Sequence, residues 1–213
     1  MKFTRITKIK FISAFFASVS VFLFFSCSKP GDMTVQRAMK AYQNQNYEEA
    51  LNLFLEAKDE SSNYSDELIY TFIANLYAVQ EDIENSTVYQ EKALELKPDY
   101  RGLVTLGMNY HMLEKDDEAE ETYKKAVKLM PEKGEAYASL GSLYIGQKKY
   151  SEAVENLKKA AEYEPKIAVI HANLAVALSL SGNKNAAEEE FKKAEELKCE
   201  NLDEFKIRAE ILN

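Results

Sequence analysis

A step of 34 residues recurs along this chain and places the same residue types at the same points of successive segments. Small and large apolar residues both follow it: Gly107, Gly141 and Ala175; Tyr110, Tyr144 and Leu178; Ala119, Ala153 and Ala187; Ala126, Ala160 and Ala194. A repeat of this length is typical of a helix-turn-helix unit. Because one such unit cannot bury its apolar face alone, successive units must stack on each other. The spacing therefore predicts an all-α protein, a curved stack of helices with a long groove.

The first 26 residues have the composition of a secretory signal. Basic residues precede an uncharged apolar run over 11–25, and this run is shorter than the ~20 residues that a membrane span needs. It ends at Phe24-Phe25-Ser26-Cys27, which resembles a bacterial lipoprotein signal, cleaved just before a cysteine that carries the lipid. We therefore predict a signal peptide over 1–26, lipidation at Cys27 with palmitate among the acyl chains, and a lipidated tether over 27–31.

Two other interpretations of this segment stay open. An ordinary secretory signal would end in an A-x-A-like cleavage site, and the apolar run is not followed by one. An uncleaved signal anchor would require the run to recruit flanking apolar residues such as Ile9. Ser28 follows the cysteine, where enterobacterial lipoproteins that stay at the inner membrane carry aspartate. By that analogy we expect an outer-membrane lipoprotein of the bacterial cell envelope that faces the periplasm, with the cell exterior as the alternative.

The chain is acidic, and this excludes one class of partner. It has 27 Lys and Arg against 35 Asp and Glu, which gives a formal net charge of -8. The predicted signal peptide carries four basic and no acidic residues, so its removal lowers the net charge by four to about -12. Nucleic-acid binding requires clustered Lys and Arg, so we expect this acidic chain not to bind nucleic acid. Anionic lipid headgroups also repel such a surface, so the membrane contact would depend on the lipid.

The residues that follow the 34-residue step resemble those of the tetratricopeptide repeat (TPR) family. One segment, 134–167, carries the family's pattern as Tyr137, Leu140, Gly141, Tyr144, Ala153, Leu157, Ala160 and Pro165. A second, 100–133, carries Leu103, Leu106, Gly107, Tyr110, Ala119, Tyr123, Ala126 and Pro131. The small residues let the two helices of a unit cross closely, and the proline stops the second helix.

The resemblance implies a right-handed superhelical solenoid. We expect a TPR domain over 32–201 with five units: 31–64, 67–99, 100–133, 134–167 and 168–201. Residues 202–213 carry apolar residues at helical spacing and are expected to form a capping helix over the last unit.

The resemblance also implies a concave groove, lined by the first helix of each unit, for a protein or peptide partner. The candidate groove residues are Met39, Tyr42, Asn75, Val79, Arg101, Val104, Met108, His111, Met112, Ile145, Val176 and Leu180. An apolar groove with methionines suits an amphipathic helix or an extended apolar segment. Family members that capture acidic chaperone tails use several cations, and Arg101 is the only cation in this set. The alternative for Val104, Met108, Met112, Val176 and Leu180 is ordinary packing in the core.

No residue pattern typical of catalysis or metal binding occurs in the sequence. The two histidines, His111 and His171, fall in different units and without an HExxH or CxxC pattern. Carboxylates such as Glu120 and the run 188–190 are expected on solvated outer helix faces, where burial cannot tune them. We therefore expect a protein that is not an enzyme and that has no metal or cofactor.

These observations favour a lipid-anchored TPR adaptor that assembles or stabilises a membrane complex of the bacterial envelope. Resemblance supplies two examples: TPR lipoproteins of the outer-membrane β-barrel assembly machine, and pilotins of type IV pilus secretins. The alternative is an accessory component of a periplasmic small-molecule transport system, which would need a closed pocket and self-association. The sequence leaves the oligomeric state undecided.

Overall fold

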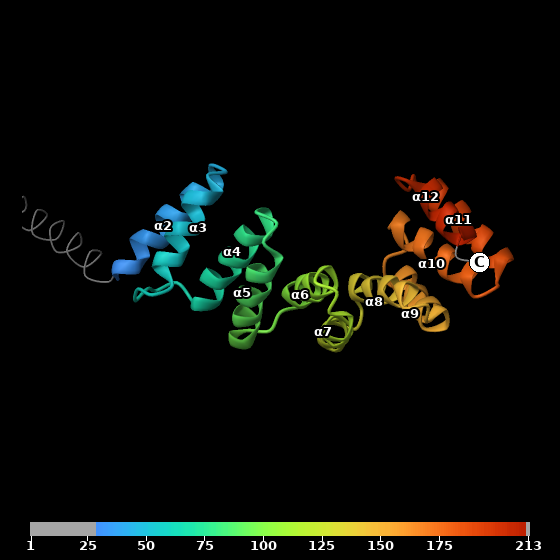
Figure 1. Cartoon of the computed structure of the whole chain (residues 1–213), viewed down its shortest axis with the longest axis horizontal. Coiled ribbons are helices and arrows are strands. Elements are labelled where there is room, and N and C mark those ends of the chain that lie inside the picture. The colour runs from blue at the N-terminus through green and yellow to red at the C-terminus, as the bar shows by residue number, and fades with distance from the viewer. Residues whose placement is uncertain (1–28, 212–213) are drawn as a thin grey trace, which may run out of the picture. The chain divides into compact units, whose positions relative to one another are not determined.

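The computed structural model describes residues 29–211, and every regular element in this range is a helix (Figure 1). The predicted all-α repeat fold is thereby confirmed. The predicted signal peptide and Cys27 lie outside the described residues. Among the described helices, none is both long and apolar enough to span a bilayer. The helices are α2 (Pro30–Gln43), α3 (Tyr47–Ala57), α4 (Asp66–Val79), α5 (Ile83–Leu96), α6 (Tyr100–Met112), α7 (Asp116–Leu129), α8 (Gly134–Gly146), α9 (Tyr150–Tyr163), α10 (Ala168–Leu180), α11 (Lys184–Glu196) and α12 (Leu202–Ile211).

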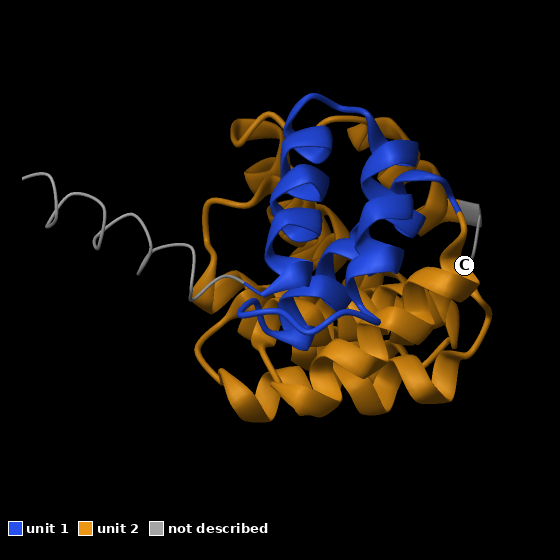
Figure 2. Cartoon of the chain, turned by 90° about the vertical axis from the view of Figure 1, so that its left-hand side faces the viewer, with its two compact units in different colours: residues 1–81 blue, residues 82–213 orange. Residues whose placement is uncertain are grey.

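The chain divides into two compact units, residues 1–81 and 82–213 (Figure 2). The described part of the first unit contains α2, α3 and α4, and the second unit contains α5 to α12. The division falls in the turn between α4 and α5, two helices that the sequence pattern assigns to one repeat. In the second unit, α6 packs with α7, α8 with α9, and α10 with α11, as antiparallel pairs joined by short turns.

The turns inside these pairs repeat the 34-residue step in their backbone. Glu114, Lys148 and Gly182 all have left-handed backbone angles, with φ of 58°, 59° and 87°. The residue after each one donates its backbone N–H to a carbonyl in the last turn of the first helix, at 2.8–2.9 Å. Such a left-handed residue satisfies carbonyls that the helix end leaves unpaired. The recurring turn therefore sets how each second helix folds back on the first.

The two helices of a pair cross where a glycine faces a large side chain. A Cβ atom built on Gly141 would lie 2.4 Å from Cγ of Leu157, and one built on Gly107 would lie 2.5 Å from the ring of Tyr123. Both of these large residues are buried, and burial raises the pKa of Tyr123 to about 12. The alanines that follow the 34-residue step are buried as well. Small residues thus let each helix pair approach closely, as the sequence predicts.

In the first unit, one carboxylate ties the start of α2 to the loop before α4. Asp32 accepts hydrogen bonds from the backbone N–H of Lys29 at 2.9 Å, the hydroxyl of Ser62 at 2.8 Å, and the backbone and side-chain N–H groups of Asn63 at 2.6 and 2.7 Å. The bond from the Asn63 backbone is the largest of the causes that lower the pKa of Asp32 to about 2. The first residues of α2 are therefore held in place by contacts distant in the sequence.

We expect Gly141→Ala to lower the free energy of unfolding by about 1–3 kcal/mol, because the added methyl group overlaps the buried Leu157 side chain. Gly146→Ala is the matched control, since a Cβ atom there meets no atom within 4 Å and alanine favours the helix. Urea titrations of both variants measure the difference. Equal stabilities of the two variants would show that the helix crossing tolerates a Cβ atom.

The low pKa of Asp32 predicts a pH dependence. The unfolded chain binds a proton at this group near pH 3.8, whereas the folded chain resists protonation down to about pH 2. The stabilisation by Asp32 is therefore complete above about pH 4 and is lost as the pH falls toward 2. We expect Asp32→Asn to make the free energy of unfolding, measured by urea titration, depend less on pH in this range. The control is Asp59→Asn, which removes an exposed carboxylate of the same loop and should leave that pH dependence unchanged. If the unfolding free energies of Asp32→Asn and of the unmodified protein changed equally with pH, the stabilising role of Asp32 would be wrong.

Candidate functional site

The most exposed apolar side chains among the predicted groove residues of the second unit lie on α6. Met108 and Met112 are 51% and 57% exposed, although most of their neighbours on this helix are buried. Their spacing of four residues puts them on one face of the helix, together with His111 and Arg101. These four residues, Arg101, Met108, His111 and Met112, are named the α6 patch. Methionine is flexible and polarisable, so such a patch can adapt to an apolar partner.

His111 is oriented by a carboxylate from the next helix. Its Nδ1 lies 2.7 Å from Oδ1 of Asp116, in the first turn of α7. An ionised carboxylate only accepts hydrogen bonds, so Nδ1 carries the proton and the ring is held in one direction. Nε2 is the ring nitrogen left to meet a partner beside the two thioethers.

Four predicted groove residues are instead buried in the second unit. Val104, Ile145, Val176 and Leu180 all belong to its apolar core. Their burial corrects the prediction that they line a groove, and it agrees with the alternative for Val104, Val176 and Leu180. Met108 and Met112 are exposed, so ordinary core packing does not account for them.

The capping helix explains why α10 offers no open groove face. α12 packs mainly against α10 and less against α11. Its Ala209 shares a core with Val176 and Leu180, and the carbonyl oxygen of Ala209 accepts a hydrogen bond from the Ser179 hydroxyl at 3.4 Å. The chain's own C-terminal helix thus covers the part of α10 that the repeat pattern would leave to a partner.

The remaining predicted residues lie in the first unit. Met39 and Tyr42 on α2 are half-buried, and the Tyr42 ring packs edge-on against Phe72 with the centroids 5.3 Å apart. Asn75 and Val79 on α4 are exposed. In this unit the exposed groove candidates therefore lie on α4.

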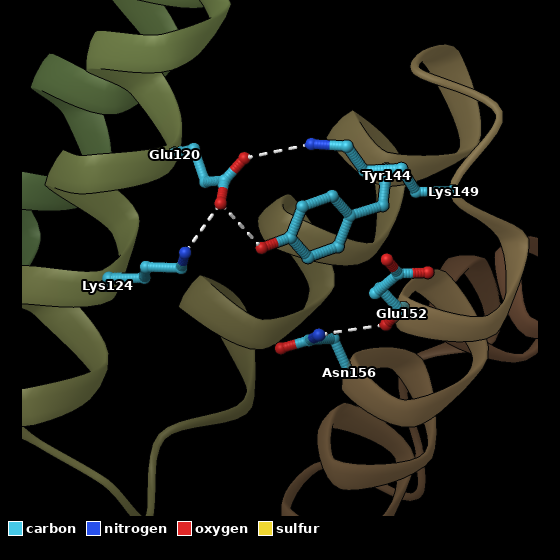
Figure 3. Close-up of polar contacts among 6 residues, drawn as sticks. All are labelled: Glu120, Lys124, Tyr144, Lys149, Glu152 and Asn156. Atoms are coloured by element: carbon cyan, nitrogen blue, oxygen red, sulfur yellow. Dashed lines mark hydrogen bonds and ion pairs between the residues drawn. The ribbon is translucent and has the colours of Figure 1, made fainter.

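Two polar clusters were missed by sequence reasoning. Glu190 was expected on a solvated face, but its side chain is 14% exposed and lies 2.6 Å from Nδ1 of the buried His171. The other cluster surrounds Glu120. Glu120 on α7 was expected on a solvated face, but its side chain is only 19% exposed. It accepts hydrogen bonds from Lys124 at 2.5 Å and from the Tyr144 hydroxyl at 3.0 Å, and Lys149 lies 3.5 Å away (Figure 3). The bond from Lys124 is the largest cause that lowers the pKa of Glu120, and burial raises the pKa of Tyr144.

This cluster joins α7 to α8 and to the turn after α8, so its role is to hold neighbouring repeats together. The only signal in the sequence was Tyr144 itself, a repeat position with a hydroxyl to satisfy. Across residues 29–211, no group of three or more His, Cys, Asp or Glu side chains is arranged to hold a metal ion.

Comparison with protein families gives two matches, both described as tetratricopeptide repeat. One sequence model matches residues 68–100 and 100–133, and another matches residues 144–198. No curated protein matches the chain significantly.

Several solved structures share the fold. MamA 41-end from Desulfovibrio magneticus RS-1 is 20% identical, with a TM-score of 0.70 over 79% of this chain and 95% of that one. YrrB, described as a TPR protein with an unusual peptide-binding site, is 22% identical, with a TM-score of 0.69 over 84% of this chain and 91% of that one. At such low identity these likenesses show the fold alone. The repeat matches, the buried small residues at the helix crossings and the shared fold place this chain in the tetratricopeptide repeat family, a family of protein-interaction scaffolds.

Proposed function

We propose that this protein is a non-catalytic, lipid-anchored scaffold of the bacterial cell envelope that holds a polypeptide partner on the α6 patch and helps to assemble or stabilise a membrane complex. The observation that carries the proposal is the exposure of Met108 and Met112 on a helix whose opposite face is buried in the core. Exposed large apolar side chains that gather on one face are typical of interaction sites. The repeat architecture supports the same role, since stacked helix pairs offer long surfaces for binding.

The chemistry of the α6 patch indicates the kind of segment that it binds. Arg101 and Met112 are eleven residues apart, so the patch extends along about 16 Å of helix. Two thioethers at its centre favour an apolar surface, and Arg101 at one end offers a charged donor for a carboxylate. An amphipathic helix of about three turns, acidic toward the Arg101 end, satisfies these contacts.

The envelope location rests on the N-terminal sequence. The predicted lipid on Cys27 would lie only three residues before α2, which begins at Pro30. Three residues span at most about 10 Å, so such a lipid would hold the first helix close to the bilayer surface. Asp32 restrains the start of that helix by its bonds to the loop before α4. The outer membrane is the proposed destination, with the solenoid facing the periplasm.

We expect cells that express Cys27→Ala to lose incorporation of labelled palmitate and to release the protein from the membrane fraction, because the acylated thiol is gone. The control is Cys199→Ala, which removes the other cysteine and leaves the signal intact. Full labelling of Cys27→Ala would contradict the lipid anchor.

In-cell photocrosslinking tests the partner surface. A photoreactive residue at Met108 should capture one polypeptide, identified by mass spectrometry, because its side chain lies at the centre of the exposed patch. The same residue at Glu155, an exposed position on α9, should not capture that polypeptide. If the folded, membrane-bound protein forms no protein adduct from Met108, the scaffold role of the α6 patch is wrong.

A further inference from the structure

A second apolar surface lies on the opposite face of α6, within the second unit. A cavity of about 780 Å³ opens there between α5 and α7. Its floor is formed by Leu103, Leu106 and Tyr110 of α6, while Leu94 of α5 and Leu129 of α7 line its sides. Leu129 is 47% exposed, so apolar area remains open at the rim. By helical spacing these floor residues point about half a turn away from Met108 and Met112.

The two walls of this groove carry opposite charges. Glu91 and Glu95 lie on the α5 side, and Lys125 and Lys128 lie on the α7 side. Each pair is spaced by three or four residues, so its members share one helix face. Glu91 accepts a hydrogen bond from the Tyr110 hydroxyl, and Lys125 pairs with Glu121 on its own helix at 2.8 Å. Because Glu91 and Lys125 are already engaged, the exposed side chains of Glu95 on α5 and Lys128 on α7 carry the opposite charges at the rim of the groove.

The equivalent surface two repeats later is lined differently, so the repeat fold alone does not create an apolar groove. There, 68 residues on, His171 replaces Leu103 and Glu190 replaces Thr122. The ring of His171 lies between Glu190 Oε2, at 2.6 Å from Nδ1, and the carbonyl oxygen of Pro165, at 3.0 Å from Nε2. This cavity is smaller, about 530 Å³, and internal polar contacts fill its floor. In the groove over α6 the equivalent positions are Leu103 and Thr122, and the internal polar contact is the bond from Tyr110 to Glu91 at the wall.

We propose that the groove between α5 and α7 binds an amphipathic helix of a partner protein, with basic residues along the edge that faces α5 and acidic residues along the edge that faces α7. An apolar stripe with charged residues on both edges is the pattern by which helices select a partner helix in coiled coils. The floor from Leu103 to Tyr110 spans about two helical turns, which matches apolar residues at i, i+3 or i+4, and i+7 of the incoming helix. The inference rests on the proposed scaffold function and adds a contact surface distinct from the α6 patch.

The test uses three labelled, helix-stapled peptides that share one leucine stripe. The mixed peptide has lysines on one edge and glutamates on the other, and two further peptides carry only lysines or only glutamates on both edges. Binding to the full-length protein in detergent is measured by fluorescence polarisation. We expect the mixed peptide to bind about tenfold more tightly than either single-sign peptide, because only it matches both walls.

Charge reversal on one wall then gives the decisive comparison. The double variant Lys125→Glu, Lys128→Glu makes both walls acidic and changes only exposed side chains. We expect this variant to bind the mixed peptide about tenfold more weakly and to prefer the all-lysine peptide. Leu129→Lys should abolish binding of every peptide, whereas Ile207→Lys, a comparably exposed apolar position on α12, should not.

Three outcomes would overturn the proposal. One is unchanged peptide preference in the charge-reversed variant, and another is no binding of any peptide. The third is self-association that Leu129→Lys abolishes, because it would make a second copy of this chain the occupant. Met108 photocrosslinking separates this failure from failure of the proposed function: a partner still captured from Met108 would leave the scaffold role intact without this groove.

Discussion

The close crossing of the two helices in each repeat is the contact on which the rest of the second unit depends. At Gly141 and Gly107 the absence of a Cβ atom lets Leu157 and Tyr123 reach the opposite helix backbone. The left-handed turn residues, 34 positions apart, return the chain at the right point to make this crossing. Because one face of the first helix packs closely on the second helix, its other faces can contact neighbouring helices or a partner.

What each repeat does with those faces depends on a few polar side chains. Glu120 and Tyr144 bind each other between α7 and α8, and His171 binds Glu190 between α10 and α11. Where such pairs form, they satisfy each other's hydrogen-bonding groups within the fold. Around α6 the two thioethers of the patch and the side chain of Leu129 at the rim of the groove are exposed to solvent. The same architecture therefore carries internal polar pairs at some repeats and exposed apolar side chains at another.

The two ends of the described chain are occupied by contacts within each unit. Asp32 fastens the start of α2 to the loop before α4, and α12 covers α10. Solenoids need such terminal contacts, because an end repeat otherwise exposes the apolar face that would meet its neighbour. In the second unit, α6 and α10 are each the first helix of a repeat, and α6 has the more exposed surface because α12 covers α10.

The 34-residue step alone was enough to predict the helices, their pairing, the buried alanines and the glycine crossings, because these depend on residues close in sequence. Candidate groove residues could be chosen from the same periodicity, but it could not separate Met108 from Val104 or Val176. Val176 lies in a core that includes Ala209 of α12, and Glu120 is bonded to Tyr144 from the next repeat. Those contacts join distant parts of the chain, so only the tertiary structure decided which side chains are exposed to a partner. The lipid anchor at Cys27 stays a prediction of the sequence, since it depends on chemistry at a residue outside the described part of the fold.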